Sequence, residues 1–500
     1  MLYPGSVLPA IVALMLVAII YQPLAGFVIC AVCLMVMLLF AHSDVWLKGL
    51  KGVTPGIVYL TVIFGAFWLS PYTKISTETG PAEKSFSIYY HFMGLVSPWE
   101  IMLATAMLLV LLWKRRKGET LSLGARHGLI LIFALYCIAF FVGILHSGAG
   151  LLAYGPTAAR RPFIALIPVL SCFACYLLVI NTIENRKQLS VIFRLMRWLT
   201  VAVILIGLGR LILMVQGVQQ GLWFFGLPVV LYDQMVMLYV PIFVIFLQIC
   251  SGHAVRKWQW AGFALMLFFI LFSTRRFNYL LLGAGLLFVY ILRPRIRLAS
   301  RFRWGKKQAV PLAVLVAGSG IAFATITQLR QGVTQAVYSM DMASRIGQKN
   351  SGDMRLAEVR NMLRNMEERP YTFVSGFGLG TLWRAIDYQP VDPFTRRLRI
   401  SRNWYPKFHL PYISMFYRLG TAGTALFLIW FVVRSRALKN GLATVRRPLQ
   451  PLALSMFIFF LLVFPSVADT FNPTSWTLCG IYLGLLEKMQ EFFPKSCPDS

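Results

Sequence analysis

SGDMRLAEVRNMLRNMEERPYTFVSGFGLG, residues 351–380, lies within the longest polar interval of a chain that is otherwise mostly apolar. The interval runs from about Gln328 to His409 and separates two long apolar segments. It carries thirteen lysines and arginines against seven acidic residues. Lys and Arg normally accumulate in short cytoplasmic loops, so a long basic loop on the other side of a membrane is unusual. We interpret this interval as the functional part of the chain and the apolar remainder as its frame.

Apolar runs of roughly 17 to 25 residues recur along the chain, each long enough to cross a hydrocarbon core of about 30 Å as a helix. Hydrophobic residues make up 58% of the 500 residues. Lipid offers no hydrogen-bond partner to an open backbone, so the spans must be helical. The pattern predicts an all-α polytopic membrane protein with about 12–14 transmembrane helices and one large loop. The predicted spans are 5–20, 23–41, 54–72, 98–113, 129–146, 163–182, 198–215, 228–250, 258–274, 277–292, 309–327, 409–433, 450–467 and 475–488.

The positive charges predict how these spans are oriented. Basic clusters at 114–117, 186–197, 256–257, 293–307 and 434–447 fall on alternate loops, which places them and both termini in the cytoplasm. Residues 1–20 lack a charged start and a small-residue cleavage site, so we expect them to form the first span. The chain then divides into spans 1–327, a large periplasmic loop 328–408, and C-terminal spans with a cytoplasmic tail, 409–500.

The formal net charge of +30 does not indicate a nucleic-acid partner. Most of the positive charge can be placed on one side of the membrane, where it orients the spans and contacts anionic lipids. All but the last of the eight cysteines fall within apolar runs. Cys172 and Cys175 have the spacing of a redox or zinc pair, but no second ligand pair accompanies them, so we expect buried, inert thiols. No metal site and no cofactor are expected.

Within the large loop, residues 353–369 predict an amphipathic helix. Met354, Leu356, Val359, Met362, Leu363 and Met366 approximate one apolar stripe. Ser351 or Asp353 can cap its start, and Pro370 ends it. We expect this arginine-rich helix to lie along the membrane surface with its apolar face down. The following run, Gly376-Phe-Gly-Leu-Gly380, predicts a flexible turn and lacks the sequence context of a nucleotide-binding loop.

Several charged residues lie in or beside predicted spans, where each needs a partner or a purpose. Arg210 and Asp233 lie on neighbouring spans, and we expect a structural pair. Arg275 and Arg276 are adjacent cations in a very short turn that faces the large loop, with no acidic residue nearby in sequence. Because positive charge is disfavoured on that side, we interpret them as an anion-binding site rather than as a turn that reaches lipid headgroups.

His409 joins the basic loop to the next span. It maps to the same membrane face as Arg355 and the Arg275–Arg276 pair. Together these residues supply fixed cations for a phosphate or pyrophosphate and one side chain able to accept a proton near neutral pH. Glycosyl transfer from a lipid pyrophosphate needs both, because the departing diphosphate must be stabilised and the attacking hydroxyl deprotonated.

Three segments resemble motifs of the O-antigen ligase and polymerase superfamily (Wzy-type). Residues 272–279, FSTRRFNY, are similar to its Ser-x-Ser-Arg segment. Residues 352–355, GDMR, followed by a helix, a proline and the glycine run, resemble its loop pattern. FHLPY at 408–412, YRLG at 417–420 and Gly423 are similar to its His-x-x-Tyr and Gly-x-x-Gly re-entry into the membrane. The resemblance covers about 260–435, and the order of the motifs around one loop makes the combination specific.

The resemblance implies an all-helical membrane bundle in the bacterial inner membrane with its active site facing the periplasm. It implies that an undecaprenyl-pyrophosphate-linked glycan donor is joined to a glycan acceptor without a metal. It assigns His409 as the catalytic base and either Arg275 or Arg276, together with Arg355, to the donor pyrophosphate. We add the secondary candidates Arg418, Tyr412 and Arg360. A chain-length regulator and a flippase are expected companions.

Four functions remain open at this stage. Polymerisation of lipid-linked repeat units is our first interpretation, and ligation of a polymer to a lipid A-core acceptor is the second, because both use the same donor class. A structural assembly subunit of a secretion complex is the third, and a lipid-linked oligosaccharide transporter or flippase is the fourth. Transporters usually contain inverted repeats and broken helices around a mid-membrane site, and we detect neither in the sequence.

Overall fold

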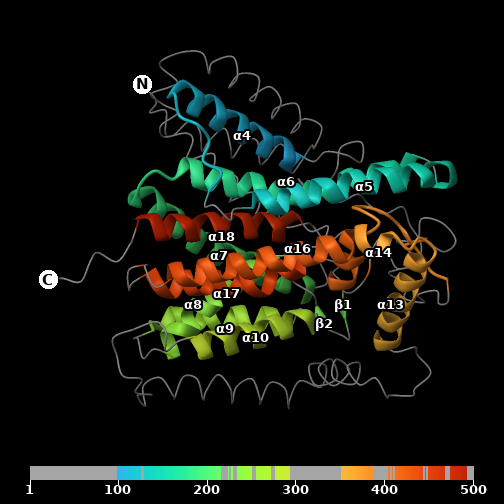
Figure 1. The fold of residues 1–500 in the computed structure, drawn as a ribbon. Coiled ribbons are helices and arrows are strands. Elements are labelled where there is room, and N and C mark those ends of the chain that lie inside the picture. The colour runs from blue at the N-terminus through green and yellow to red at the C-terminus, as the bar shows by residue number, and fades with distance from the viewer. Residues whose placement is uncertain are drawn as a thin grey trace.

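The structure is a computed structural model, and it is helical over most of the residues that it describes. These residues are 98–124, 129–154, 156–215, 223–224, 227–228, 234–250, 255–271, 276–292, 351–386, 404–405, 408, 411–442, 445, 449–467 and 473–492. In Figure 1 the long helices run side by side as a bundle, and one helix, α13, lies across one end of it. We call this the glycine end, because the Gly376–Gly380 segment packs there, and we call the other the cytoplasmic-type end, because Lys117 and Arg186, from clusters that were predicted to be cytoplasmic, form their contacts there.

The described helices of the bundle are α4 (Pro98–Arg116), α5 (Ile130–Tyr154), α6 (Pro156–Thr182), α7 (Arg186–Val215), α8 (Tyr239–Cys250), α9 (Lys257–Leu271), α10 (Arg276–Leu292), α16 (Pro411–Leu442), α17 (Gln450–Val467) and α18 (Pro473–Phe492). The smaller elements are the 3₁₀ helix η1 (Gln234–Leu238), the helices α13 (Ser351–Glu367) and α14 (Thr372–Ser375), and the strands β1 (Trp223–Phe224), β2 (Leu227–Pro228), β3 (Trp383–Arg384) and β4 (Trp404–Tyr405). The strands form two antiparallel pairs, β1 with β2 and β3 with β4.

Helices α6 and α18 pack along each other through small residues. A Cβ added to Gly480 would lie 2.1 Å from the Cys172 carbonyl oxygen, and one added to Gly484 would lie 2.7 Å from Val179 Cγ1. Small residues let membrane helices approach closely, because backbones can then pack without intervening side chains. Cys172 and Cys175 are buried free thiols on α6. The prediction that these two cysteines are buried is therefore confirmed.

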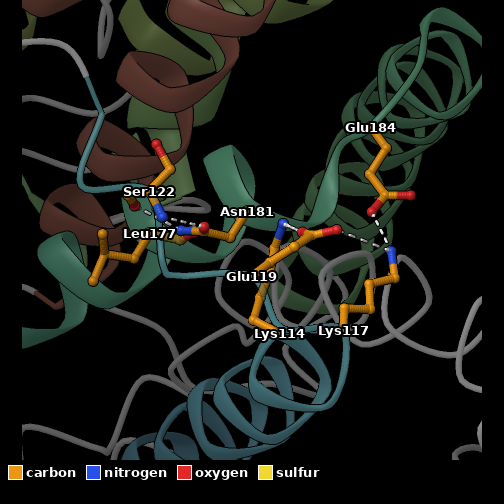
Figure 2. A network of polar contacts seen from close by, with 7 residues as sticks. All are labelled: Lys114, Lys117, Glu119, Ser122, Leu177, Asn181 and Glu184. Carbon is orange, nitrogen blue, oxygen red and sulfur yellow. Dashed lines mark hydrogen bonds and ion pairs between the residues drawn. The ribbon is translucent and has the colours of Figure 1, made fainter.

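A polar network at the cytoplasmic-type end ties the segment after α4 to the end of α6 (Figure 2). Lys114 Nζ lies 2.5 Å from Glu119 Oε2, and Lys117 Nζ lies 2.9 Å from Glu184 Oε1. The Asn181 side chain donates to the Ser122 carbonyl oxygen and accepts from the Ser122 N–H, at 2.9 and 2.8 Å. The network pairs these lysines with carboxylates.

A buried ion pair joins three helices at the same end. Arg434 of α16 pairs with Glu487 of α18, and the Tyr176 hydroxyl of α6 donates to both carboxylate oxygens of Glu487, at 2.8 and 2.9 Å. The side chain of Arg434 is only 4% exposed. A buried guanidinium is tolerated here because a carboxylate neutralises it and a hydroxyl satisfies the carboxylate.

The helices confirm the all-α expectation, while their bounds correct several predicted spans. Two described stretches, Arg161–Thr182 and Pro411–Leu442, are long and apolar enough to cross a membrane. Four shorter helical stretches are also apolar: Ile130–His146, Val236–Cys250, Leu280–Leu292 and Gln450–Pro465. The span predicted over 228–250 is wrong at its start, since a strand and a 3₁₀ helix precede α8. The predicted spans 5–20, 23–41, 54–72 and 309–327 lie outside the described residues, so the total of about 12–14 and the sidedness stay predictions.

Candidate functional site

Helix α16 is interrupted at Gly420, where φ is 64° and ψ is −173°. A positive φ of this kind is readily adopted only by glycine. Such an interruption removes the helical partners of preceding carbonyl groups, which must then find other donors. The N–H groups of Phe377 and Gly378 donate to the carbonyl oxygens of Tyr417 and Arg418, at 2.8 and 2.9 Å. The glycine segment therefore replaces hydrogen bonds at the break.

The Gly376–Gly380 segment is buried, with φ of 71°, 85° and 74° at its three glycines. A Cβ added to Gly376 would lie 2.2 Å from the Arg418 carbonyl oxygen, and one added to Gly378 would lie 2.0 Å from the backbone nitrogen of Gly143 on α5. On the same side, Leu379 N–H donates to the Ala139 carbonyl oxygen at 2.8 Å. The positive φ angles of the three glycines agree with the predicted flexible-backbone turn, and backbone from two bundle helices packs against it.

Helix α13 begins at Ser351 and ends at Glu367, three residues before Pro370, which is close to the predicted range 353–369, while its capping by Ser351 or Asp353 stays a prediction. Its predicted apolar stripe is wrong in part. Leu356 and Leu363 are 51% and 38% exposed. The buried face instead contains Glu358, Asn361, Met362, Asn365 and Met366. Counting apolar residues alone could not identify this face, because amides occupy two of its positions.

Those amides hydrogen-bond to the backbone at β3. Asn365 donates through Nδ2 to the Arg384 carbonyl oxygen at 2.7 Å and accepts from the Arg384 N–H at 3.0 Å. Asn361 accepts from the Ile386 N–H at 2.9 Å. Side-chain amides thus satisfy backbone groups on one side of β3, while β4 pairs with the strand. This fixes α13 against the segment that leads toward His409.

A second, smaller core lies under α13, separate from the main core of the bundle. It contains Met362, Met366, Phe377, Trp383, Ala385, Phe408 and Tyr417. The Phe408 ring stacks on Trp383 at 4.9 Å and meets Tyr417 edge-on at 5.2 Å. Phe408 immediately precedes His409 and is 2% exposed. Its burial anchors the chain one residue before the predicted base.

Two arginines from different helices lie within electrostatic reach of each other at the glycine end. Arg418 is 5% exposed on α16, and Arg161 is half-buried on α6. The two positive charges are close enough to repel each other. A Cβ added to Gly380 would lie 2.4 Å from the carbonyl carbon of Arg161. The glycine segment therefore contacts the backbone of both arginines. Sequence reasoning included Arg418 among the secondary candidates and missed Arg161.

His146 of α5 lies at this end, and the sequence analysis gave it no role. Its Nε2 lies 3.2 Å from the Tyr371 hydroxyl, and its ring stacks against Tyr371 and packs on Phe377. Arg369 is also within electrostatic reach. The sequence gives no local signal for this contact, since His146 and Tyr371 are 225 positions apart.

The structure describes only part of the predicted site. Arg360 is exposed on α13, and Tyr412 is 55% exposed at the start of α16. Arg276 is the first residue of α10, and Arg355 lies near the start of α13. Arg275, His409 and Asp233 lie outside the described residues. The meeting of Arg275 or Arg276 with Arg355 and His409, and the Arg210–Asp233 pair, therefore stay predictions. Within the described ranges, no group of three or more His, Cys, Asp or Glu side chains is arranged to hold a metal ion.

Residues 261–428 match a family model described as O-antigen ligase. The match confirms the resemblance inferred from the motifs. It includes α10, α13, the glycine segment and the broken part of α16. No curated protein matches the chain. The match and the apolar helices together indicate a membrane protein with ligase- or polymerase-type glycosyltransferase activity.

Proposed function

We propose that this chain, whose residues 261–428 form an O-antigen ligase family domain, polymerises undecaprenyl-pyrophosphate-linked repeat units at the periplasmic face of the bacterial inner membrane. The product is a surface polysaccharide or exopolysaccharide. One observation carries the proposal. The matched residues include the small core in which Phe377 of the glycine segment and Tyr417 of α16 pack with Phe408, the residue before His409.

The proposed reaction has one bond forming and one breaking. The acceptor hydroxyl attacks the anomeric carbon of the donor glycan, and the bond from that carbon to the diphosphate oxygen breaks. The diphosphate leaves with the bonding electron pair, and His409 takes the hydroxyl proton. Arg275 or Arg276, together with Arg355, stabilises the negative charge that develops on the diphosphate.

The fold supports these roles by limiting movement near the reacting groups. Phe408 is packed between Trp383 and Tyr417, so the backbone that enters His409 is fixed on one side. Helix α13, which carries Arg355, is tied to β3 by two buried asparagines. A catalytic group held in this way loses little conformational freedom when substrate binds, which favours reaction.

The test is transfer by purified protein with a lipid-linked repeat unit as donor. We expect His409→Ala to lower the rate by about 10²–10⁴-fold, the usual contribution of one general base, while donor binding is largely kept. Arg355→Ala should abolish polymer formation without changing the protein level, and lysine should substitute poorly because the bidentate guanidinium is lost. Near-wild-type turnover by His409→Ala would remove this histidine from the mechanism.

Ligation is the second candidate, and the matched family description favours it because it names a ligase. The two reactions share the donor and differ in the acceptor. Incubation of the protein with the lipid-linked repeat unit alone separates them. A ladder of growing chains indicates polymerisation, whereas product that forms only after a lipid A-core acceptor is added indicates ligation.

A further inference from the structure

Arg161 occupies an unusual position for a cation on an apolar helix. It lies near the start of α6, directly before Pro162, and its side chain is half-buried. Its Nε atom is buried and has no hydrogen-bond partner in the part of the chain that the structure describes. A buried guanidinium N–H without an acceptor is unfavourable, because it has lost its water without a replacement.

The nearby charge increases this cost. Arg418 of α16 lies within electrostatic reach of Arg161, and its positive charge disfavours the charge on Arg161. The Gly376–Gly380 segment contacts the backbone of both arginines. Gly378 N–H donates to the Arg418 carbonyl oxygen, and Gly380 packs against the Arg161 backbone. Two helices and one buried segment therefore keep the cations close together.

An anion between or beside the two guanidiniums would make the burial of the Arg161 charge favourable. It would accept a hydrogen bond from Arg161 and convert the repulsion into attraction to a shared partner. Guanidinium groups match phosphate oxygens particularly well, because their planar donors form two parallel hydrogen bonds. The chemistry of the pair therefore favours a phosphate group over a neutral ligand.

We propose that Arg161, acting with Arg418, binds a phosphate group next to the Gly376–Gly380 segment. Two sources share this chemistry: the diphosphate of the lipid-linked donor and the headgroup of an anionic membrane lipid. With the donor as source, the proposal rests on the proposed function. Arg161 lies outside the matched residues 261–428. The proposed site therefore includes a ligand-binding residue from the part of the chain that precedes the match.

The test measures binding to purified protein in nanodiscs of neutral phosphatidylcholine. The probes are undecaprenyl diphosphate without glycan and, separately, phosphatidylglycerol. Arg161→Gln should weaken binding of at least one probe about ten- to hundredfold, the usual value of a hydrogen bond to a charged group. Lys187→Gln is the matched control, because it removes the same charge from an exposed site at the start of α7, and it should bind as wild type does.

Each outcome has a definite meaning. A loss confined to undecaprenyl diphosphate identifies the donor as the source, and a loss confined to phosphatidylglycerol identifies a lipid headgroup. Unchanged affinity of Arg161→Gln for both probes overturns the proposal. If that variant fails to fold, Arg161→Lys is tested instead. It keeps the charge but loses the paired donors, so about tenfold weaker binding is expected and unchanged binding overturns the site.

Binding and transfer are measured independently. A protein that binds undecaprenyl diphosphate through Arg161 but transfers no glycan would retain this site and lose the proposed function. A protein that transfers glycan normally with Arg161→Gln and binds both probes unchanged would retain the function and lose this site.

Discussion

The two ends of the bundle differ in how their buried arginines are accommodated. At the cytoplasmic-type end, Arg434 of α16 pairs with Glu487, which also accepts from Tyr176. At the glycine end, Arg418 of the same helix lies within reach of a second cation, Arg161. The first arrangement is neutralised by the protein itself and serves stability. The second places two arginines beside a buried backbone segment, and among the described residues the Nε of Arg161 has no hydrogen-bond partner.

The largest effect on stability is expected from the neutralised end. Glu487→Gln leaves Arg434 buried without its carboxylate, so we expect a loss of about 3–5 kcal/mol in the free energy of unfolding. The measurement is thermal or denaturant unfolding of the purified protein. Donor binding by the remaining folded protein should be unchanged, because the pair lies at the other end of α16 from Arg418. If Glu487→Gln had normal stability but bound the donor more weakly, the Arg434–Glu487 pair would serve binding and not stability.

At the glycine end, Gly378→Ala is the most informative substitution. Its φ of 85° costs an alanine about 1–2 kcal/mol. The added methyl group, 2.0 Å from the Gly143 nitrogen, costs about a further 1–3 kcal/mol through overpacking. We expect lower stability and a larger loss of transfer, because the segment borders both Arg161 and Arg418.

Gly262→Ala on α9 is the matched control for that substitution. A Cβ at Gly262 meets nothing within 4 Å, and the residue lies inside a helix, where alanine is favoured over glycine by about 0.5–1 kcal/mol. The control should therefore be as stable as wild type or slightly more stable, with normal transfer. Equal behaviour of the two variants would show that the close approach of Gly378 to α5 is unimportant.

A smaller effect is expected where α13 is attached. Asn365→Ala removes the hydrogen bonds to both backbone groups of Arg384, at about 1–3 kcal/mol for the buried groups left unsatisfied. Because α13 carries Arg355, the transfer rate should fall by more than this loss of stability explains. Glu367→Ala, at an exposed position of the same helix, is the control and should change neither quantity. A normal rate in Asn365→Ala would mean that α13 needs no such attachment.

Sequence patterns predicted those parts of the site that depend on neighbouring residues. The helix α13, Ser351–Glu367, lies close to the range 353–369 that its apolar residues and Pro370 predicted, and the importance of the 376–380 run follows from its glycines. The burial of that run could not be predicted, because its contacts with Ala139 and Gly143 depend on how α5 packs. The buried face of α13 was misassigned for a similar reason, since its asparagines hydrogen-bond to the backbone at β3, which lies later in the chain.

Arg161 and His146 could not be identified as residues of the site from the sequence. Arg161 follows Arg160 near the start of α6, and His146 lies at the end of the apolar stretch Ile130–His146. Their surroundings come from residues more than two hundred positions away, including Arg418 and Tyr371. The role of a charge at such a position depends on its spatial neighbours, which the sequence does not give.

The smallest effect is expected in the exposed ion pairs of the cytoplasmic-type end. The hydrogen bond from Lys114, reinforced by the charge of Lys117, holds the pKa of Glu119 below its usual range. Glu119→Gln should therefore lower the thermal midpoint only slightly, because solvent screens exposed pairs. A lowered pKa in the folded state means that the contribution is fully present above the unfolded value of about 4.3 and is lost as the pH falls through the folded value. The difference between wild type and Glu119→Gln should thus be present at neutral pH and vanish in strong acid. A difference as large as that of Glu487→Gln, or one that persists in acid, would show that this network is more than a solvated surface contact.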